Sequence, residues 1–204
     1  MKSNNPFEPY GIQHLSVSTC NTFAASPAMF VLTKCLKHKN LVGAAAHRGT
    51  AVETGIVYGL ETGAPDTECI KVANEEFWRL TALSNDPAHD KEQAAVPQMV
   101  IQGLQELRGY GKPSETQGQI NFSFDEIAVP FTGFFDIRWA DSHILTDIKT
   151  THALPSKIST NHARQVSLYV TALGNEDDPR VTYVTPKKSA TYRVENVSEH
   201  VKSL

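Results

Sequence analysis

The stretch that decides the fold is Gly133-Phe134-Phe135-Asp136-Ile137-Arg138-Trp139, followed by Ala140-Asp141-Ser142 and by His143-Ile144-Leu145-Thr146-Asp147-Ile148-Lys149-Thr150. Both arms are rich in apolar and β-branched residues, and short polar residues separate them, which is typical of a β-hairpin. A turn centred on Asp141 and Ser142 pairs residue 140 with residue 143, and the same register places Asp136 opposite Asp147. Directly opposed side chains have Cβ atoms about 4.5–5.5 Å apart. We therefore expect the hairpin to bring two carboxylates together.

Lys149 lies two residues beyond Asp147, so it shares that face of the strand. Two carboxylates this close repel each other unless a cation lies between them, and oxygen ligands suit Mg²⁺ or Mn²⁺. Such a metal could activate a water and offset charge on a phosphodiester, while Lys149 could position or deprotonate the water, or neutralise the phosphate. The alternative is a surface salt bridge, in which the facing Asp136 would have no evident purpose.

A helix is expected from about Val42 to Leu60, with Val52, Ile56 and Leu60 as its buried stripe. Its internal glycines indicate close packing against another element. Glu53 lies beside the buried stripe, so its carboxylate could enter a half-buried site; the alternative is a solvated helix residue. Arg48 is a candidate contact for a phosphate.

These segments resemble the PD-(D/E)XK nuclease superfamily, and within it the RecB-like branch. Four pieces match in order, from about Leu15 to about Tyr183. They are an opening serine motif and first helix at residues 15–18 and 23–30, the segment Arg48-Gly49-Thr50-Ala51-Val52-Glu53, the pair Gly133-x-x-Asp136 and Asp147-Ile148-Lys149-Thr150, and Gln165-Val166-Ser167-Leu168-Tyr169. Each motif alone is weak, but the ordered set is strong.

The resemblance implies an α/β restriction-endonuclease-like core, in which helices flank a central mixed β-sheet, and an N-terminal helical portion. It implies a metal-dependent DNA exonuclease of phage-like recombination, repair or degradation, with Lys149 aligning the attacking water. The implied metal ligands are Glu53, Asp136, Asp147 and the carbonyl of Ile148. The implied DNA contacts are Arg48, Gln165, Tyr169, Ser18 and Thr150.

Alternative functions are a DNA endonuclease of the same fold, a DNA-binding subunit that has lost catalysis and, more distantly, another Mg²⁺-dependent phosphate enzyme. DNA is the expected partner. A single-strand annealing or other recombination protein is a further candidate partner, and an oligomer is compatible with the sequence.

The chain departs from the RecB-like pattern at two places. Glu53 stands where that branch often has a histidine, but phage-type exonucleases of the superfamily use a helical glutamate in a comparable role. An all-carboxylate site should favour Mg²⁺, with Mn²⁺ able to substitute. Some RecB-like nucleases hold an iron–sulfur cluster with one early and three late cysteines. Here Cys20, Cys35 and Cys69 all precede the acidic strands, so we predict no iron–sulfur cluster.

The 204 residues are expected to form one nuclease domain, with a helical portion at about 26–110 and the catalytic sheet with a crossover helix at about 117–195. No apolar run is long enough for a membrane span, and residues 1–6 lack the apolar region of a signal peptide. Three cysteines without metal-type spacing favour a cytoplasmic location, in the host if the protein is phage-encoded. A net charge of −3 neither indicates nor excludes a nucleic-acid binder.

The first helix is expected to begin at Ser26 as N-cap, with Met29, Leu32 and Leu36 facing the core. Lys34, Lys37 and Lys39 would then form a solvated face or meet a phosphate backbone. Further helices are expected after Pro65-Asp66, from near Pro97, and at about 160–173. Strands are expected at 120–124, 127–132, in the hairpin, and at 180–184 and 190–194. A crossover helix between strands favours a mixed sheet with helices on both faces.

Overall fold

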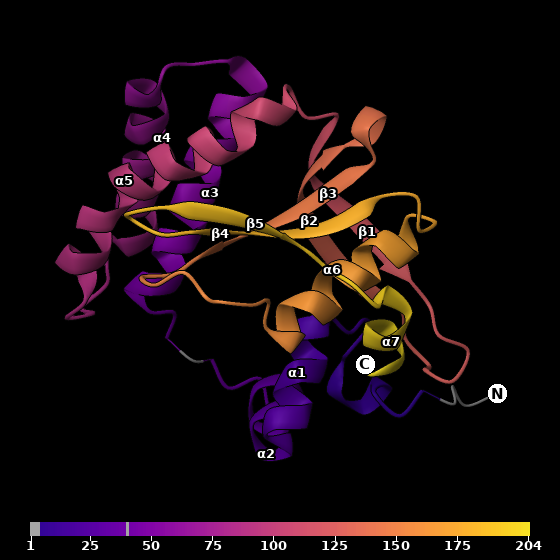
Figure 1. Cartoon of the computed structure of the whole chain (residues 1–204). Coiled ribbons are helices and arrows are strands. Elements are labelled where there is room, and N and C mark those ends of the chain that lie inside the picture. The colour runs from indigo at the N-terminus through magenta and orange to yellow at the C-terminus, as the bar shows by residue number, and fades with distance from the viewer. Residues whose placement is uncertain (1–4, 40) are drawn as a thin grey trace.

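A computed structural model describes residues 5–39 and 41–204, so most of the stretch at residues 1–6, where no signal peptide was expected, lies outside the described residues. Its centre is a five-stranded sheet in the order β1-β2-β3-β4-β5 (Figure 1). The strands are β1 (Glu115–Phe122), β2 (Phe131–Trp139), β3 (Ile144–Thr150), β4 (Asp178–Val184) and β5 (Ser189–Arg193). Only β3 and β4 run parallel among these neighbours, and α6 (Thr160–Ala172) connects them. The expected mixed sheet with a crossover helix is confirmed.

The strand expected at 127–132 does not exist as a separate element. β2 begins at Phe131 and continues without a break through the first arm of the hairpin. Pro130 precedes it and has no N–H to donate to a ladder, and its carbonyl instead accepts a hydrogen bond from the Leu15 N–H at 2.9 Å. The sheet therefore has one long strand where the sequence suggested two.

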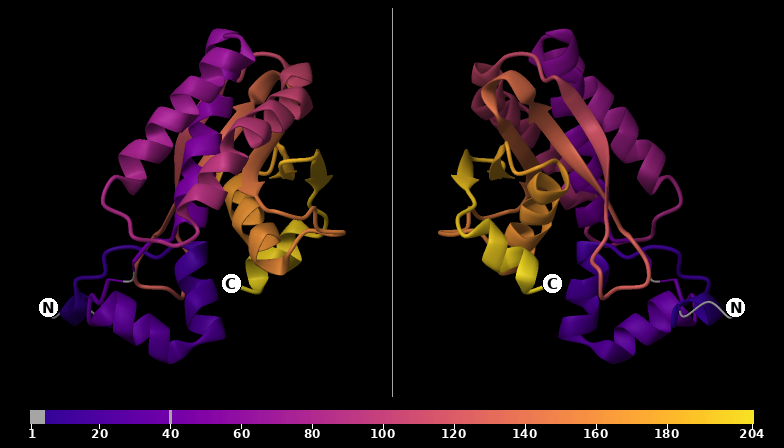
Figure 2. Two further views of the ribbon diagram at one scale, coloured as in Figure 1. Left: turned by 90° about the vertical axis from the view of Figure 1, so that its left-hand side faces the viewer. Right: turned by 90° about the vertical axis from the view of Figure 1, so that its right-hand side faces the viewer.

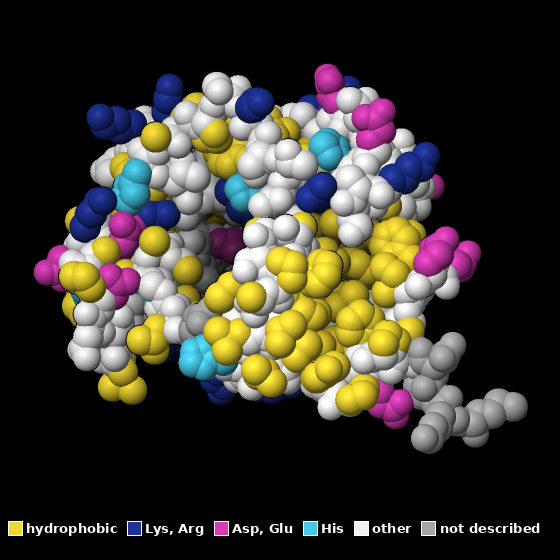
Figure 3. All heavy atoms as spheres, turned by 90° about the horizontal axis from the view of Figure 1, so that it is seen from below, with side chains coloured by type: hydrophobic (Ala, Val, Ile, Leu, Met, Phe, Trp, Pro, Cys, Tyr) yellow, Lys and Arg dark blue, Asp and Glu magenta, His cyan; other side chains and the backbone are white. Residues whose placement is uncertain are grey.

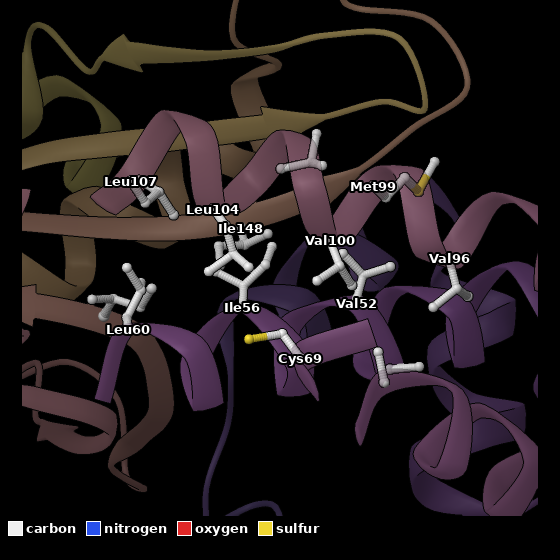
Figure 4. Close-up of a cluster of buried hydrophobic side chains, with 14 of the residues drawn as sticks. Val52, Ile56, Leu60, Cys69, Val96, Met99, Val100, Leu104, Leu107 and Ile148 are labelled. Atoms are coloured by element: carbon white, nitrogen blue, oxygen red, sulfur yellow. The ribbon is translucent and has the colours of Figure 1, made fainter. Parts of the chain in front are cut away.

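Three helices cover one face of the sheet: α3 (Ala44–Thr62), α4 (Asp66–Thr81) and α5 (His89–Leu107). Their buried side chains form one hydrophobic cluster with Ile148 of β3 (Figure 4). The expected stripe of α3 is confirmed, because Val52, Ile56 and Leu60 are fully or almost fully buried. The helix expected from near Pro97 in fact begins at His89, since Ala95 and Val96 extend the buried stripe before the proline.

Glycines let α3 lie very close to its neighbours. A Cβ added at Gly55 would lie 2.8 Å from the Cβ of Ala73, and one added at Gly59 would lie 2.7 Å from the Cys69 sulfur. These distances are shorter than side-chain contacts allow, so larger residues there would push α4 away. The close packing expected from the glycines of this helix is confirmed at these two positions.

On the opposite face of the sheet, α6 packs with α7 (Val197–Lys202), and the two views in Figure 2 show a helical layer on either side. The buried cluster on this side joins α6 to strands β2, β3 and β4. None of the described helices is long and apolar enough to cross a membrane.

The N-terminal helices differ from the expected single helix. Ser16 caps α1 (Val17–Ala25), and Ser26 then caps α2 (Pro27–Phe30), which continues into a π-helical turn at Val31–Cys35. The expectation that Met29, Leu32 and Leu36 face the core is wrong, since they are 38%, 37% and 66% exposed. The short helix and its π-helical turn break the 3.6-residue spacing, and Phe30 is buried in their place.

Candidate active site

The hairpin has the register expected from the sequence. Ile137 pairs with Thr146 and Trp139 with Ile144, so the next position places Asp136 across from Asp147. The ladder stops there, and the Asp136 Oδ2 accepts a hydrogen bond from the Ile148 N–H at 2.6 Å. The two strands thus separate where the carboxylates meet, and Asp136 closes the gap between them.

Lys149 lies with Asp147 as the strand alternation requires. Its Nζ is 2.6 Å from the Asp147 Oδ2, and the Asp147 side chain is 1% exposed while that of Lys149 is 26% exposed. A surface salt bridge is therefore the wrong description, because one partner is buried. Within the described residues, the Asp147 Oδ2 makes no hydrogen bond beyond this ion pair.

Glu53 reaches the same place from α3, and a residue that sequence reasoning missed holds it there. The Gln117 side-chain amide donates a hydrogen bond to the Glu53 Oε1. By the β1–β2 register Gln117 lies opposite Asp136, and its φ of 52° is left-handed within a strand. Such strained backbone is common at functional sites. A glutamine in the sequence does not indicate that its φ is positive, so this residue could not be predicted.

Burial and neighbouring charges raise the pKa of two of the acids, Asp136 and Glu53. Burial, followed by the charges of Asp147 and Glu53, raises the pKa of Asp136 well above its usual range. Burial and the charge of Asp147 likewise raise the pKa of Glu53, although the hydrogen bond from Gln117 opposes this. Burial alone would lower the pKa of Lys149, but Asp147 and Asp136 raise it overall. The site thus carries more negative charge than its one lysine can offset.

This arrangement fits a hard divalent cation. A buried carboxylate oxygen with one ion pair, beside a second buried carboxylate, is the oxygen donor set that Mg²⁺ takes. Among the described residues no three His, Cys, Asp or Glu side chains form a ready metal cluster. The pair Asp136 and Asp147 would therefore be the main ligands, with Glu53 and the Ile148 carbonyl beside them. Mg²⁺ often binds through only one or two carboxylates and fills its other positions with water and phosphate oxygens.

Tyr169 and Gln165 of α6 lie on the other side of the acids. The Gln165 amide donates to the Tyr169 hydroxyl at 2.7 Å. Tyr169 is only 4% exposed, and burial with the charge of Asp147 raises its pKa. Its ring packs on Gly133, where an added Cβ would lie 2.6 Å from the ring. These residues form a wall of the site, and Tyr169 offers little surface to DNA.

Arg48 and Thr150, expected as DNA contacts, are joined to each other instead. The Arg48 guanidinium is paired with Glu92 of α5, and its Nη2 donates to the carbonyl and hydroxyl of Thr150, both at 3.2 Å. Arg48 is 4% exposed and so does not present its charge to a phosphate. Ser18 lies exposed in α1, where its hydroxyl is 2.9 Å from that of Ser16.

One edge of the site is open to solvent. Glu53 and Gln117 border a pocket of about 440 Å³ whose lining does not include Asp136, Asp147 or Lys149. Seen from below, the molecule is hollowed, and acidic side chains lie deep in the hollow beside a broad hydrophobic area (Figure 3). The pocket therefore gives access to the site at Glu53, whereas Asp136 and Asp147 are 8% and 1% exposed.

Comparison with known proteins gives one informative match. The family model of the PD-(D/E)XK nuclease superfamily matches residues 14–203. No curated protein matches the sequence. The solved structure named SSO0001 is 13% identical with a TM-score of 0.39, and the alignment covers 82% of this chain and 76% of that one.

Proposed function

Because the chain belongs to the PD-(D/E)XK nuclease superfamily, we propose that it is a divalent-metal-dependent deoxyribonuclease that degrades DNA from an end. The superfamily itself implies a nuclease that acts on DNA. The proposal adds that cleavage starts at a DNA end, and it names the metal and the residues that perform the reaction.

The observation that carries the proposal is the cluster of Asp136, Asp147 and Lys149. Two buried carboxylates from neighbouring strands and a lysine 2.6 Å from one of them form a site for a cation and a phosphate. Burial, followed by the charges of Asp147 and Glu53, raises the pKa of Asp136, and the charge of Lys149 opposes this. A group that arrives with positive charge is therefore favoured there.

Each residue of this cluster has a distinct proposed role. A Mg²⁺ ion held by Asp136, Asp147, Glu53 and the Ile148 carbonyl would supply Lewis acidity toward water and phosphate. Lys149, kept protonated by the acids around it, orients the attacking water and neutralises charge on the phosphate. Gln117 fixes the Glu53 carboxylate, and Tyr169 limits access of water from the α6 side.

One feature favours an exonuclease of the RecB-like, phage-type kind. The third carboxylate of the cluster is a helical glutamate, Glu53. We propose Mg²⁺ as the natural ion with Mn²⁺ able to replace it, and no iron–sulfur cluster, since all three cysteines precede the catalytic strands. A role in recombination, repair or DNA degradation follows, with a single-strand annealing or other recombination protein as a candidate partner.

The test compares end-labelled linear duplex, linear single strand and closed circular DNA, each with Mg²⁺ or EDTA. We expect metal-dependent loss of the linear substrates alone. Lys149→Ala and Asp147→Ala should each remove nearly all cleavage and remain folded, while Lys71→Ala, an exposed lysine of α4, serves as the matched control.

Other outcomes would change the assignment. Cleavage of the circle would make the protein an endonuclease. DNA binding without cleavage under any metal would make it a DNA-binding protein that has lost catalysis. Wild-type cleavage by Lys149→Ala would refute the site.

A further inference from the structure

The N-terminal helical segment has an unusual charge. Residues 9–52 contain no Asp or Glu and four basic residues, which leaves 15 basic and 22 acidic residues in the rest of the chain. The buried Glu92 balances Arg48. In the part of the chain that the structure describes, Lys34, Lys37 and Lys39 make no ion pair with a carboxylate. A segment of net positive charge thus lies within an acidic protein.

A groove lies on this segment. It has a volume of about 660 Å³ and runs between α1, the α2 region and the first turn of α6. Its lining is basic or uncharged and includes the apolar side chain of Met29, which is 38% exposed. The polar residues that line it are Asn21, Thr22, Ser26, Thr33, Lys34, His38 and Asn161.

The first turn of α6 connects the groove to the acidic site. Asn161 lines the groove, and the next residue, His162, has its Nδ1 2.7 Å from the Tyr183 hydroxyl. Tyr183 is paired with Lys149 in the β3–β4 register, so His162 lies on the side of the sheet that carries Lys149. α1 is tied to α6 by a hydrogen bond from Arg164 to Asn21 at 3.5 Å. In Figure 1, α1 and α2 lie directly below the start of α6.

We propose that this groove holds the single DNA strand that is joined to the phosphate under attack. The proposal rests on the nuclease function proposed above. Grooves that bind single strands combine positive charge along the backbone with apolar or aromatic contacts to the bases, and Lys34 and Met29 provide both. Lys34 contacts a phosphate several nucleotides from the cleaved bond, which makes affinity depend on strand length.

The test measures how the kinetics depend on substrate length. Lys34→Ala is compared with the wild type on single strands of increasing length and on the p-nitrophenyl ester of thymidine 5′-phosphate, which reaches only the acidic site. We expect the KM for a long strand to rise about fivefold, the effect of losing an exposed charge pair of about 1 kcal/mol. The loss should shrink as the strand shortens, and kcat for the long strand should stay near that of the wild type. Lys71→Ala on α4 is the matched control and should resemble the wild type throughout.

Binding gives a second, independent readout. In the Lys149→Ala background with EDTA, the slope of log Kd against log salt should fall by about 0.7 on adding Lys34→Ala, the value for one phosphate contact on a single strand. An unchanged slope together with unchanged length dependence would refute the groove. Equal loss on the ester and the long strand would also refute it. If the wild type cleaves neither substrate, the nuclease proposal fails, and the binding slope still decides whether the groove holds a strand.

Discussion

Replacing Glu92 with alanine should lower the free energy of unfolding by about 3–5 kcal/mol, because the change leaves the Arg48 charge buried without its partner. Both side chains are only 5% exposed. The Arg48 Nε has no hydrogen-bond partner among the described residues, so few contacts to the guanidinium remain once the Glu92 carboxylate is removed. What remains is His152, whose Nε2 is 2.9 Å from the Arg48 Nη1, and the two bonds to Thr150 at 3.2 Å.

The predicted loss is large for a protein of this size. For a domain of 150–250 residues, 1 kcal/mol corresponds to about 2–4 °C in Tm, so Glu92→Ala should lower the Tm by roughly 6–20 °C. Urea unfolding and thermal melting at neutral pH measure it. Glu76→Ala is the control, since it breaks an ion pair with Arg79 whose arginine side chain is 68% exposed. Such surface pairs contribute about 0–1 kcal/mol.

A double substitution distinguishes the cost of an unpaired buried charge from the cost of lost side-chain packing. Arg48→Met with Glu92→Leu removes both charges and keeps the volume, so the double variant should be close to the wild type or more stable. A cost for Glu92→Ala no larger than for Glu76→Ala would refute the reasoning. So would a double variant that is less stable than Glu92→Ala alone.

Three further predictions concern acid groups and packing. Asp136→Asn should abolish cleavage yet raise the Tm at pH 8 in EDTA, because an acid whose pKa is raised by folding stabilises the fold less as the pH rises through that pKa. Adding Mg²⁺ should raise the Tm of the wild type more than the Tm of the variant. A variant Tm below the wild-type Tm in EDTA would contradict the prediction. Gly133→Ala should lower the free energy of unfolding by about 1–3 kcal/mol and reduce cleavage, because the new Cβ displaces the Tyr169 ring. Urea unfolding and a cleavage assay measure the two effects. An unchanged urea midpoint would show that the ring moves without cost. Burial would raise the pKa of Glu92, but the hydrogen bond from His152 and the charge of Arg48 lower this pKa overall, so wild-type stability should fall as the pH drops below the ordinary value of 4.5. In thermal melts between pH 3 and 6, the stability of Glu92→Gln should depend less on pH. A parallel loss of stability in both proteins would count against this prediction.

The parts of the fold with strong local signals could be predicted from the sequence. The hairpin register follows from turn position and alternation, and it places Asp136 and Asp147 correctly because strand geometry allows little else. The stripe of α3 is equally reliable, since its period is that of a regular helix packed against two others.

The failures have physical causes. The apolar residues Met29, Leu32 and Leu36 lie in a short helix that turns π-helical, so their spacing does not correspond to one buried face. Gln117 was missed because nothing in a glutamine signals positive φ or a contact with a helix 64 residues away. Both depend on long-range packing, which sequence periodicity does not contain.

Arg48 shows how the helix is fixed relative to the sheet. It lies five residues before Glu53 on α3, and its guanidinium binds the end of β3 at Thr150, the residue after Lys149. At the neighbouring Gly49 an added Cβ would lie 3.3 Å from the Thr150 hydroxyl oxygen, so helix and strand already touch there. The buried charge pair with Glu92 therefore holds the helix that carries Glu53 against the strand that carries Asp147 and Lys149. A charge that the sequence suggested for DNA thus sets the distance between the proposed ligands.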